Sequence, residues 1–161
     1  MTNTSIIQRD LENRWKPEKT LFFRVSLTKG LFKTSRCIIP ASGFIEGQNK
    51  KYHFIEGKNK ALAIGGIYKT YQFDDKIITT ASIITCPGNP QLADIHKKSI
   101  PLLLDYEDKN LIDAWLSPQF TESQAFAYLL DNKIRQHLIA TPIQAARNLK
   151  AIGEPVQLIP D

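Results

Sequence analysis

Four residues of this chain have the side-chain types and neighbours needed for proton transfer beside an anion: Glu46, His96, Lys97 and Lys98. Glu46 ends the apolar run GFIE, where partial burial would raise the pKa of its carboxyl and suit it to proton transfer near neutrality. His96 lies in LADIHKKSIP, at a predicted corner that holds a side chain rigidly while leaving it accessible. The two lysines can hold a phosphate. Together these groups suit acid–base chemistry on a polyanion.

Each of these residues also has a structural interpretation. Glu46 can be a strand-end carboxylate paired with a lysine of GQNKK, and His96 can be a histidine of a surface turn. His53 and His137 lie in or beside predicted strands and are expected to be ordinary strand residues. The sequence contains no phosphate-binding loop, dinucleotide-binding glycine motif, serine-hydrolase motif or zinc-protease motif. We therefore expect no cofactor and no metal.

The elements that position these residues are mostly predicted strands. From Arg36 on, apolar runs rich in Ile, Tyr, Phe and Thr alternate with turn residues: CIIP, GFIE, KYHFIEG, ALAIGGIYKTY and KIITTASIITC. GQNKK and GKNK are predicted hairpin-type turns, because Gly and Asn tolerate positive φ.

Helices are expected over Gln91–Lys97, after an N-cap at Asp105, and after a capping box at Thr121. The tail supplies two more predicted strands. This order predicts an α+β domain around a mostly antiparallel sheet or barrel-like core with a few short helices.

Composition fits one ordinary domain of 161 residues with a substantial core. A net charge of +5 and a pI near 9.2 favour an anionic partner such as nucleic acid, although a lysine-rich surface gives the same values. Cys37 and Cys86 match neither a disulfide framework nor a zinc pattern, and we expect both to be reduced core residues. No stretch approaches the roughly 18 apolar residues of a membrane span, and the start has no secretion signal. A cytoplasmic protein without membrane contact is expected.

Several segments together resemble the SRAP family, the SOS-response-associated peptidase-like proteins that are also described as abasic-site processing proteins. RCIIPASGFIEG at 36–47 is similar to the family's RCLIPADGFYEW pattern. Residues 85–104 are similar to its TTEANPLMAEIHxRMPVIL pattern, with Asn89-Pro90 and Ile95-His96 in place. The stretch 105–116, which ends in AWL, and the stretch 142–159 match later parts of the pattern. The resemblance covers about residues 36–161.

The resemblance implies a compact fold that binds single-stranded DNA at abasic sites in the DNA damage (SOS) response. In that family an N-terminal cysteine forms a DNA–protein crosslink with the sugar aldehyde, and the same nucleophile would serve a peptidase (hydrolase) activity. A glutamate and a histidine that assist it map onto Glu46 and His96. The glutamate would orient the amine and shuttle protons, and the histidine would protonate the sugar oxygen. Arg36, Lys97 and Lys98 are the expected DNA contacts.

The N-terminal part departs from the family pattern. The family begins Met-Cys-Gly-Arg and carries an NAR-x-ET motif, whereas this chain begins Met-Thr-Asn-Thr and has ENRWKPEKT in that region. Gly47 stands where the family has Trp. We expect residues 1–35 to be a shortened or variable segment without the family's first strands, and residues 36–161 to be an SRAP-like domain.

Three functions remain open at this stage. The first is abasic-site processing, in which Glu46 and His96 are present but the nucleophile is not identified. The second is a non-catalytic module that binds single-stranded nucleic acid. The third is a fragment whose unpaired sheet edge needs another chain.

Overall fold

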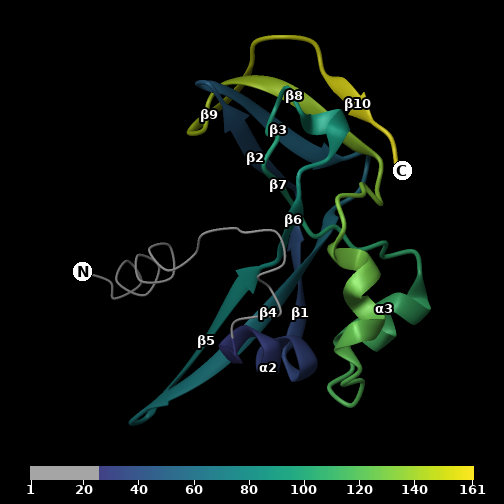
Figure 1. Cartoon of the computed structure of the whole chain (residues 1–161). Helices are drawn as coiled ribbons and strands as arrows, with labels where there is room; N and C mark the ends of the chain where they lie inside the picture. The colour runs from purple at the N-terminus through teal and green to yellow at the C-terminus, as the bar shows by residue number, and fades with distance from the viewer. Residues whose placement is uncertain (1–25) are drawn as a thin grey trace.

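The structure is a computed structural model, and it describes residues 26–161. An open three-stranded sheet forms one part of the molecule. Helix α2 (Ser26–Thr34) leads into β1 (Arg36–Ala41), which pairs with β4 (Leu62–Phe73). The long β4 then pairs with β5 (Lys76–Ile83), and every position of β5 is exposed. In Figure 1 this sheet lies at the lower left, with β5 at its edge.

A second sheet, at the top of Figure 1, is built from two hairpins and a C-terminal strand. Its order is β10-β8-β3-β2, and β9 also pairs with β8. All of these pairings are antiparallel. The strands are β2 (Gly43–Gln48), β3 (Lys51–Gly57), β8 (Leu138–Ala145), β9 (Asn148–Ala151) and β10 (Val156–Leu158).

A short ribbon lies between the two larger sheets in Figure 1. Its strands are β6 (Thr85–Pro87) and β7 (Ser99–Pro101), and the loop between them contains the 3-10 helix η2 (Pro90–Leu92). After the ribbon come helix α3 (Lys109–Leu116) and the 3-10 helix η3 (Ser123–Leu130). None of the helices within residues 26–161 has the length and apolar character of a membrane span.

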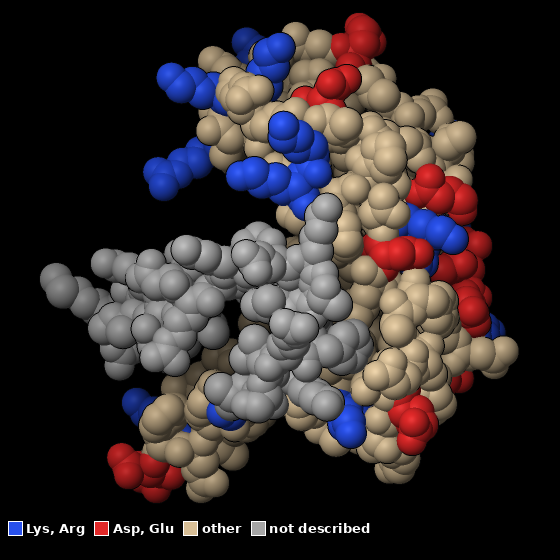
Figure 2. Space-filling view, viewed as in Figure 1, with Lys and Arg blue, Asp and Glu red and all other residues tan. Residues whose placement is uncertain are grey.

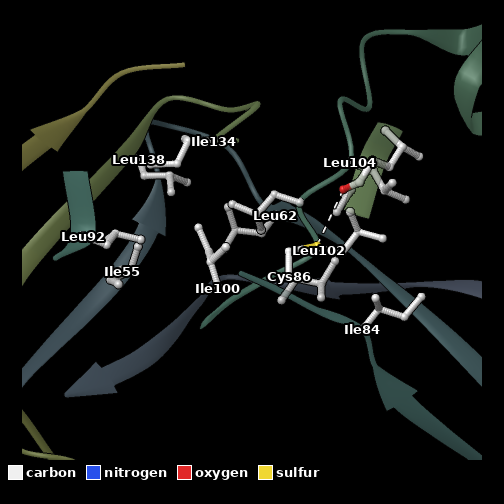
Figure 3. Close-up of a cluster of buried hydrophobic side chains, with 14 of the residues drawn as sticks. Ile55, Leu62, Ile84, Cys86, Leu92, Ile100, Leu102, Leu104, Ile134 and Leu138 are labelled. Atoms are coloured by element: carbon white, nitrogen blue, oxygen red, sulfur yellow. Dashed lines mark hydrogen bonds between the residues drawn. The ribbon is translucent and has the colours of Figure 1, made fainter. Parts of the chain in front are cut away.

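Apolar side chains from both sheets, the ribbon and the helices meet in one core. Trp115 of α3 is completely buried and packs edge-on against Phe32 and Phe126. Gly65 of β4 allows this packing, because a Cβ there would lie 2.7 Å from Leu102 and 3.3 Å from the Trp115 ring. Figure 3 shows the part of the core between the ribbon and the second sheet: Ile55, Leu62, Ile84, Cys86, Leu92, Ile100, Leu102, Leu104, Ile134 and Leu138.

The predicted class of fold is confirmed: mostly antiparallel sheets with a few short helices. The strands expected between residues 36 and 86 are present. The two predicted turns have the positive φ that was expected of them, at Asn49 (φ 53), Lys50 (φ 63) and Asn59 (φ 62). The first turn closes the predicted hairpin of β2 with β3. The hairpin expected at the second turn is wrong, because this turn leads from β3 to β4, which lie in different sheets and do not pair.

The helices differ more from the prediction than the strands do. The helix expected over Gln91–Lys97 is only the three-residue η2. Asp105 does not cap α3; the N-cap is Asp108, whose side chain accepts a hydrogen bond from Leu111 N. The expected capping box is absent, since the N-cap of η3 is Glu122 and has no side-chain bond.

The segment expected to be shortened or variable, residues 1–35, is described in part. Residues 1–25 lie outside the described residues, and Ser26–Thr34 form α2.

Candidate functional site

Glu46 lies where the core-facing side of the second sheet reaches solvent. Alternate residues of a strand share one face, so Phe44, Glu46 and Gln48 share this side of β2. Phe44 packs against the core, whereas the amide of Gln48 donates a hydrogen bond of 2.8 Å to the carbonyl of Ala93. Glu46 lies between them, with 23% of its side chain exposed. The loop after η2 therefore covers the polar end of this face.

His96 reaches Glu46 from that loop. Its Nδ1 lies 3.2 Å from the carbonyl oxygen of Gly47 and 3.4 Å from Oε2 of Glu46. Its Nε2 lies 3.4 Å from the hydroxyl of Ser99. Because a carbonyl oxygen only accepts hydrogen bonds, we assign the hydrogen to Nδ1, which leaves Nε2 of the neutral ring to accept from Ser99. The two predicted acid–base residues are thus brought together.

The loop that carries His96 is fixed by Gly88 and Asn89 at its start. A Cβ on Gly88 would clash with the carbonyl oxygen of Lys97, so only glycine allows the two ends of the loop to approach so closely. Asn89 is 2% exposed, and its amide donates to the carbonyl of Asn132 and to Oδ2 of Asp161, each at 2.7 Å. Its own oxygen accepts from the backbone N–H of Gln91. These contacts hold the corner rigidly, as proton transfer at a fixed geometry requires.

Burial raises the pKa of the Glu46 carboxyl, and the nearby His96 opposes this effect. A carboxyl with a raised pKa exchanges its proton closer to neutral pH than an exposed one does. The arrangement can therefore accept a proton on the carboxyl and deliver one from the imidazole. Within residues 26–161, no three His, Cys, Asp or Glu side chains are grouped as metal ligands would be.

Basic side chains surround this pair on the second sheet. Lys97 and Lys98 follow His96 directly and are exposed. Four more basic residues were not predicted from the sequence. They lie at the end of the sheet where the hairpins β2–β3 and β8–β9 both turn. The pairing of Tyr52 with Ile143 brings these two turns to the same end. All four are exposed: Lys50, Lys51, Arg147 and Lys150. In Figure 2, Lys and Arg side chains gather on the upper lobe, over the region of β2, β3 and β9 in Figure 1.

Arg36, expected to contact DNA, is instead inside the protein. It is 5% exposed, and its guanidinium lies 4.8 Å from the centre of the Phe126 ring. The guanidinium donates to six backbone carbonyls, those of Phe32, Lys33, Ala114, Trp115, Ser117 and Phe120. These carbonyls use all of its donors, so Arg36 holds α2 and the end of α3 together and is left out of the DNA contacts proposed below.

Gly47 occupies the position where the family pattern has Trp, and the space beside it is filled. A Cβ on Gly47 would lie 2.7 Å from the ring of Tyr52 and 2.6 Å from the carbonyl oxygen of Lys51. Tyr52 is the direct cross-strand partner of Gly47. The aromatic ring at this place therefore comes from β3 instead of β2.

Neither cysteine of the chain is a ready nucleophile. Cys86 lies in the core, where its thiol donates to the carbonyl of Leu129, and burial raises its pKa to about 12 (Figure 3). Burial also raises the pKa of Cys37. The thiolate is the reactive form, and both environments disfavour it.

We expect Cys86 to resist an alkylating reagent in the native protein at neutral pH, because its thiol is buried and protonated. Cys37 should react slowly, since it is half-buried. Mass spectrometry of the alkylated protein checks this, with protein unfolded in urea as the control in which both cysteines react. Rapid labelling of native Cys86 would contradict the burial described here.

The family model for SOS response associated peptidase (SRAP) matches residues 20–148, and the chain belongs to this family. Among solved structures, it is similar to a structural-genomics protein from Bacteroides thetaiotaomicron, with 26% sequence identity and a TM-score of 0.63. That match covers 77% of this chain and 56% of the other, so this chain spans little more than half of that protein's length. No curated protein matches the chain.

Proposed function

We propose that this chain recognises abasic sites in single-stranded DNA and uses Glu46 and His96 to move protons at the abasic sugar. The observation that carries the proposal is the contact of 3.4 Å between Nδ1 of His96 and Oε2 of Glu46, two side chains that are 50 residues apart in the sequence. Membership of the SRAP family supports a DNA-related partner.

The proposed chemistry is the opening of the closed abasic sugar. Glu46, as a carboxylate, accepts the proton of the sugar hydroxyl at C1′. The C1′–O4′ bond then breaks, and His96, which must first take up a proton on Nε2 to become an imidazolium, delivers that proton to complete the new hydroxyl on O4′. The product is the open aldehyde. Glu46 has gained one proton and His96 has lost one, so the total number of protons on the two side chains is unchanged. General acid–base groups held in this way typically contribute a factor of about 10² to 10⁴ in rate.

The exposed lysines supply the affinity for the DNA backbone. Lys97 and Lys98 lie beside His96, and the hairpin ends add Lys50, Lys51 and Arg147. A strand that crosses these residues would pass the Glu46–His96 pair. Such contacts make binding strongly dependent on salt, because each neutralised phosphate releases counterions.

A second candidate function is binding without chemistry. It is favoured by the state of the two thiols, since a family-type crosslink needs a nucleophile and both thiols within residues 26–161 are partly or fully buried. The same basic surface would then hold single-stranded nucleic acid, and Glu46 and His96 would form a structural pair.

The two functions are separated with three single-stranded oligonucleotides of the same sequence. One carries an abasic site, one a tetrahydrofuran analogue that cannot open, and one is intact. We expect salt-sensitive binding to all three. With the abasic site alone, the protein should speed the reaction of the opened aldehyde with an aminooxy reagent, which gives a product of lower mobility on a denaturing gel. Equal binding without any product would support the non-catalytic function, and absence of binding would contradict both.

The double variant Lys97→Ser, Lys98→Ser tests the binding part in the same assay. It should weaken binding to all three oligonucleotides and reduce the salt dependence by about one counterion for each lost phosphate contact. Lys109→Ser is the matched control, because Lys109 is also exposed but lies on α3. A double variant that binds as tightly as the control would exclude these lysines from the interface.

A further inference from the structure

His53 is the direct cross-strand neighbour of Glu46. In the register of β2 and β3, Glu46 pairs with His53, as Phe44 pairs with Ile55 two residues earlier. Directly paired residues of antiparallel strands project from the same face, with their Cβ atoms about 5 Å apart. His53 therefore stands on the same face of the sheet as Glu46, although no hydrogen bond or ion pair joins the two side chains in the structure.

The Nδ1 atom of His53 is buried and has no hydrogen-bond partner among residues 26–161. On the other side of β3 its cross-strand neighbour is Pro142, which has no N–H to offer. A buried polar atom without a partner is unfavourable and calls for an explanation. Glu46 can supply a hydrogen when its carboxyl is protonated.

His53 has the charge state needed to accept that hydrogen. Burial, and then the positive charge of Lys51, lower the pKa of its imidazole, so the ring is neutral at neutral pH. The titratable groups around it are Glu46 on β2, Lys51 on its own strand, and His96 through its contact with Glu46. On β8, Pro142 and Gln144 add none.

His96 cannot take the proton of a protonated Glu46 while its own Nδ1 hydrogen is directed at Gly47 and Glu46. The carboxyl then needs an acceptor on another side. We propose that Nδ1 of His53 is this acceptor: when Glu46 is protonated, its carboxyl turns toward His53 and donates to Nδ1, and the carboxyl is then held between the two histidines. His53 is thus a positioning residue that acts through Glu46.

The consequence for catalysis rests on the proposed function. When Glu46 takes the proton from the sugar hydroxyl, the new O–H of the carboxyl bonds to Nδ1 of His53, and Nε2 of His53 keeps its own hydrogen. No proton is transferred to His53 in this step. The hydrogen bond stabilises the protonated carboxyl and makes Glu46 a stronger base.

The hydrogen bond is tested without DNA, by nitrogen NMR of the histidine rings of the full chain. We expect His53 to carry its hydrogen on Nε2, and the shift of its Nδ1 to change in a step as Glu46 becomes protonated. The step should be absent in Glu46→Gln. His137→Asn assigns the signals, because His137 is an exposed histidine at the other end of the sheet. A hydrogen on Nδ1 of His53, or the same titration curve in Glu46→Gln, would overturn the proposal.

The kinetic consequence is tested with His53→Leu and His53→Asn. An Asn side chain can place its oxygen close to the position of Nδ1, whereas Leu offers no acceptor. We expect His53→Leu to lower the processing rate about five- to tenfold, with DNA affinity unchanged and the acidic limb of the pH–rate profile moved to lower pH. His53→Asn should restore most of the rate. Equal rates for the two variants would overturn the role of His53 as an acceptor.

The two tests can fail independently of each other. If the NMR result is as expected but no DNA is processed by the wild-type protein, the proposed function is wrong and the hydrogen bond stands. If DNA is processed but the titration of His53 does not depend on Glu46, the function stands and His53 has no part in it.

Discussion

Replacing Arg36 with methionine is expected to destabilise the protein by about 3–5 kcal/mol, because the guanidinium is buried and its removal takes away the hydrogen bonds that it donates to six backbone carbonyls. Three of these carbonyls, those of Lys33, Ala114 and Trp115, belong to the last turns of α2 and α3. Carbonyls in the last turn of a helix have no N–H partner within that helix. Loss of this size is a large share of the stability of an ordinary domain.

Urea unfolding followed by circular dichroism measures this loss. Lys109→Met is the matched control, because it removes an exposed cation from α3 and should change the free energy of unfolding by no more than about 0.5 kcal/mol. Arg36→Lys should recover only part of the stability, since an ammonium group has three donors and cannot span the same carbonyls. Wild-type stability in Arg36→Met would show that other groups satisfy these carbonyls.

Replacing Glu46 with glutamine is expected to reduce the rate of abasic-site processing by a factor of about 10² to 10⁴, the usual loss for a missing general base. Glutamine keeps the size of the side chain and cannot accept the proton. Binding to the tetrahydrofuran oligonucleotide should not weaken, because no phosphate contact is lost. Glu154→Gln is the matched control, an exposed carboxylate with no hydrogen bond or ion pair of its side chain within the described residues.

The same substitution should change how stability depends on pH. Because the native carboxyl of Glu46 has a raised pKa, the folded state binds this proton more tightly than the unfolded state does. The stability of the wild type should therefore fall as the pH rises from the ordinary carboxyl pKa to the raised native one. Glu46→Gln lacks this loss and should be the more stable protein at alkaline pH. Urea unfolding at acid and alkaline pH measures the difference, and a parallel pH dependence in both proteins would contradict it.

Much of the fold could be predicted from the sequence, because local chemistry determined it. The hairpin between β2 and β3 follows from Asn49 and Lys50 in positive φ between two apolar runs. The helical segment before His96 was predicted less well, since its geometry depends on the buried amide of Asn89 and on the contact of Gly88 with Lys97, which are tertiary contacts.

The candidate site, like the fold, could be predicted from the sequence only where local features determine it. Glu46 and His96 were found from their positions at the end of a strand and at a corner, and the structure brings them together. The charge of Arg36 suggested a phosphate contact, but a sequence does not show that six carbonyls gather around one side chain. His53 was expected to be an ordinary strand residue, because its unpartnered Nδ1 and its place opposite Glu46 depend on the strand register.

The contact between Asn89 and Asp161 has a practical consequence for anyone who modifies this chain. Asp161 also accepts from the backbone N–H of Ile134, and Gln91 exchanges hydrogen bonds with the backbone of Ile159. Residues 159–161 are therefore hydrogen-bonded to the loop that carries His96. An affinity tag or fluorophore joined after Asp161 would therefore disturb the hydrogen bonds that position this loop. A label at the exposed tip of the β4–β5 hairpin, beside Asp74 and Asp75, lies on the other sheet and leaves these hydrogen bonds intact.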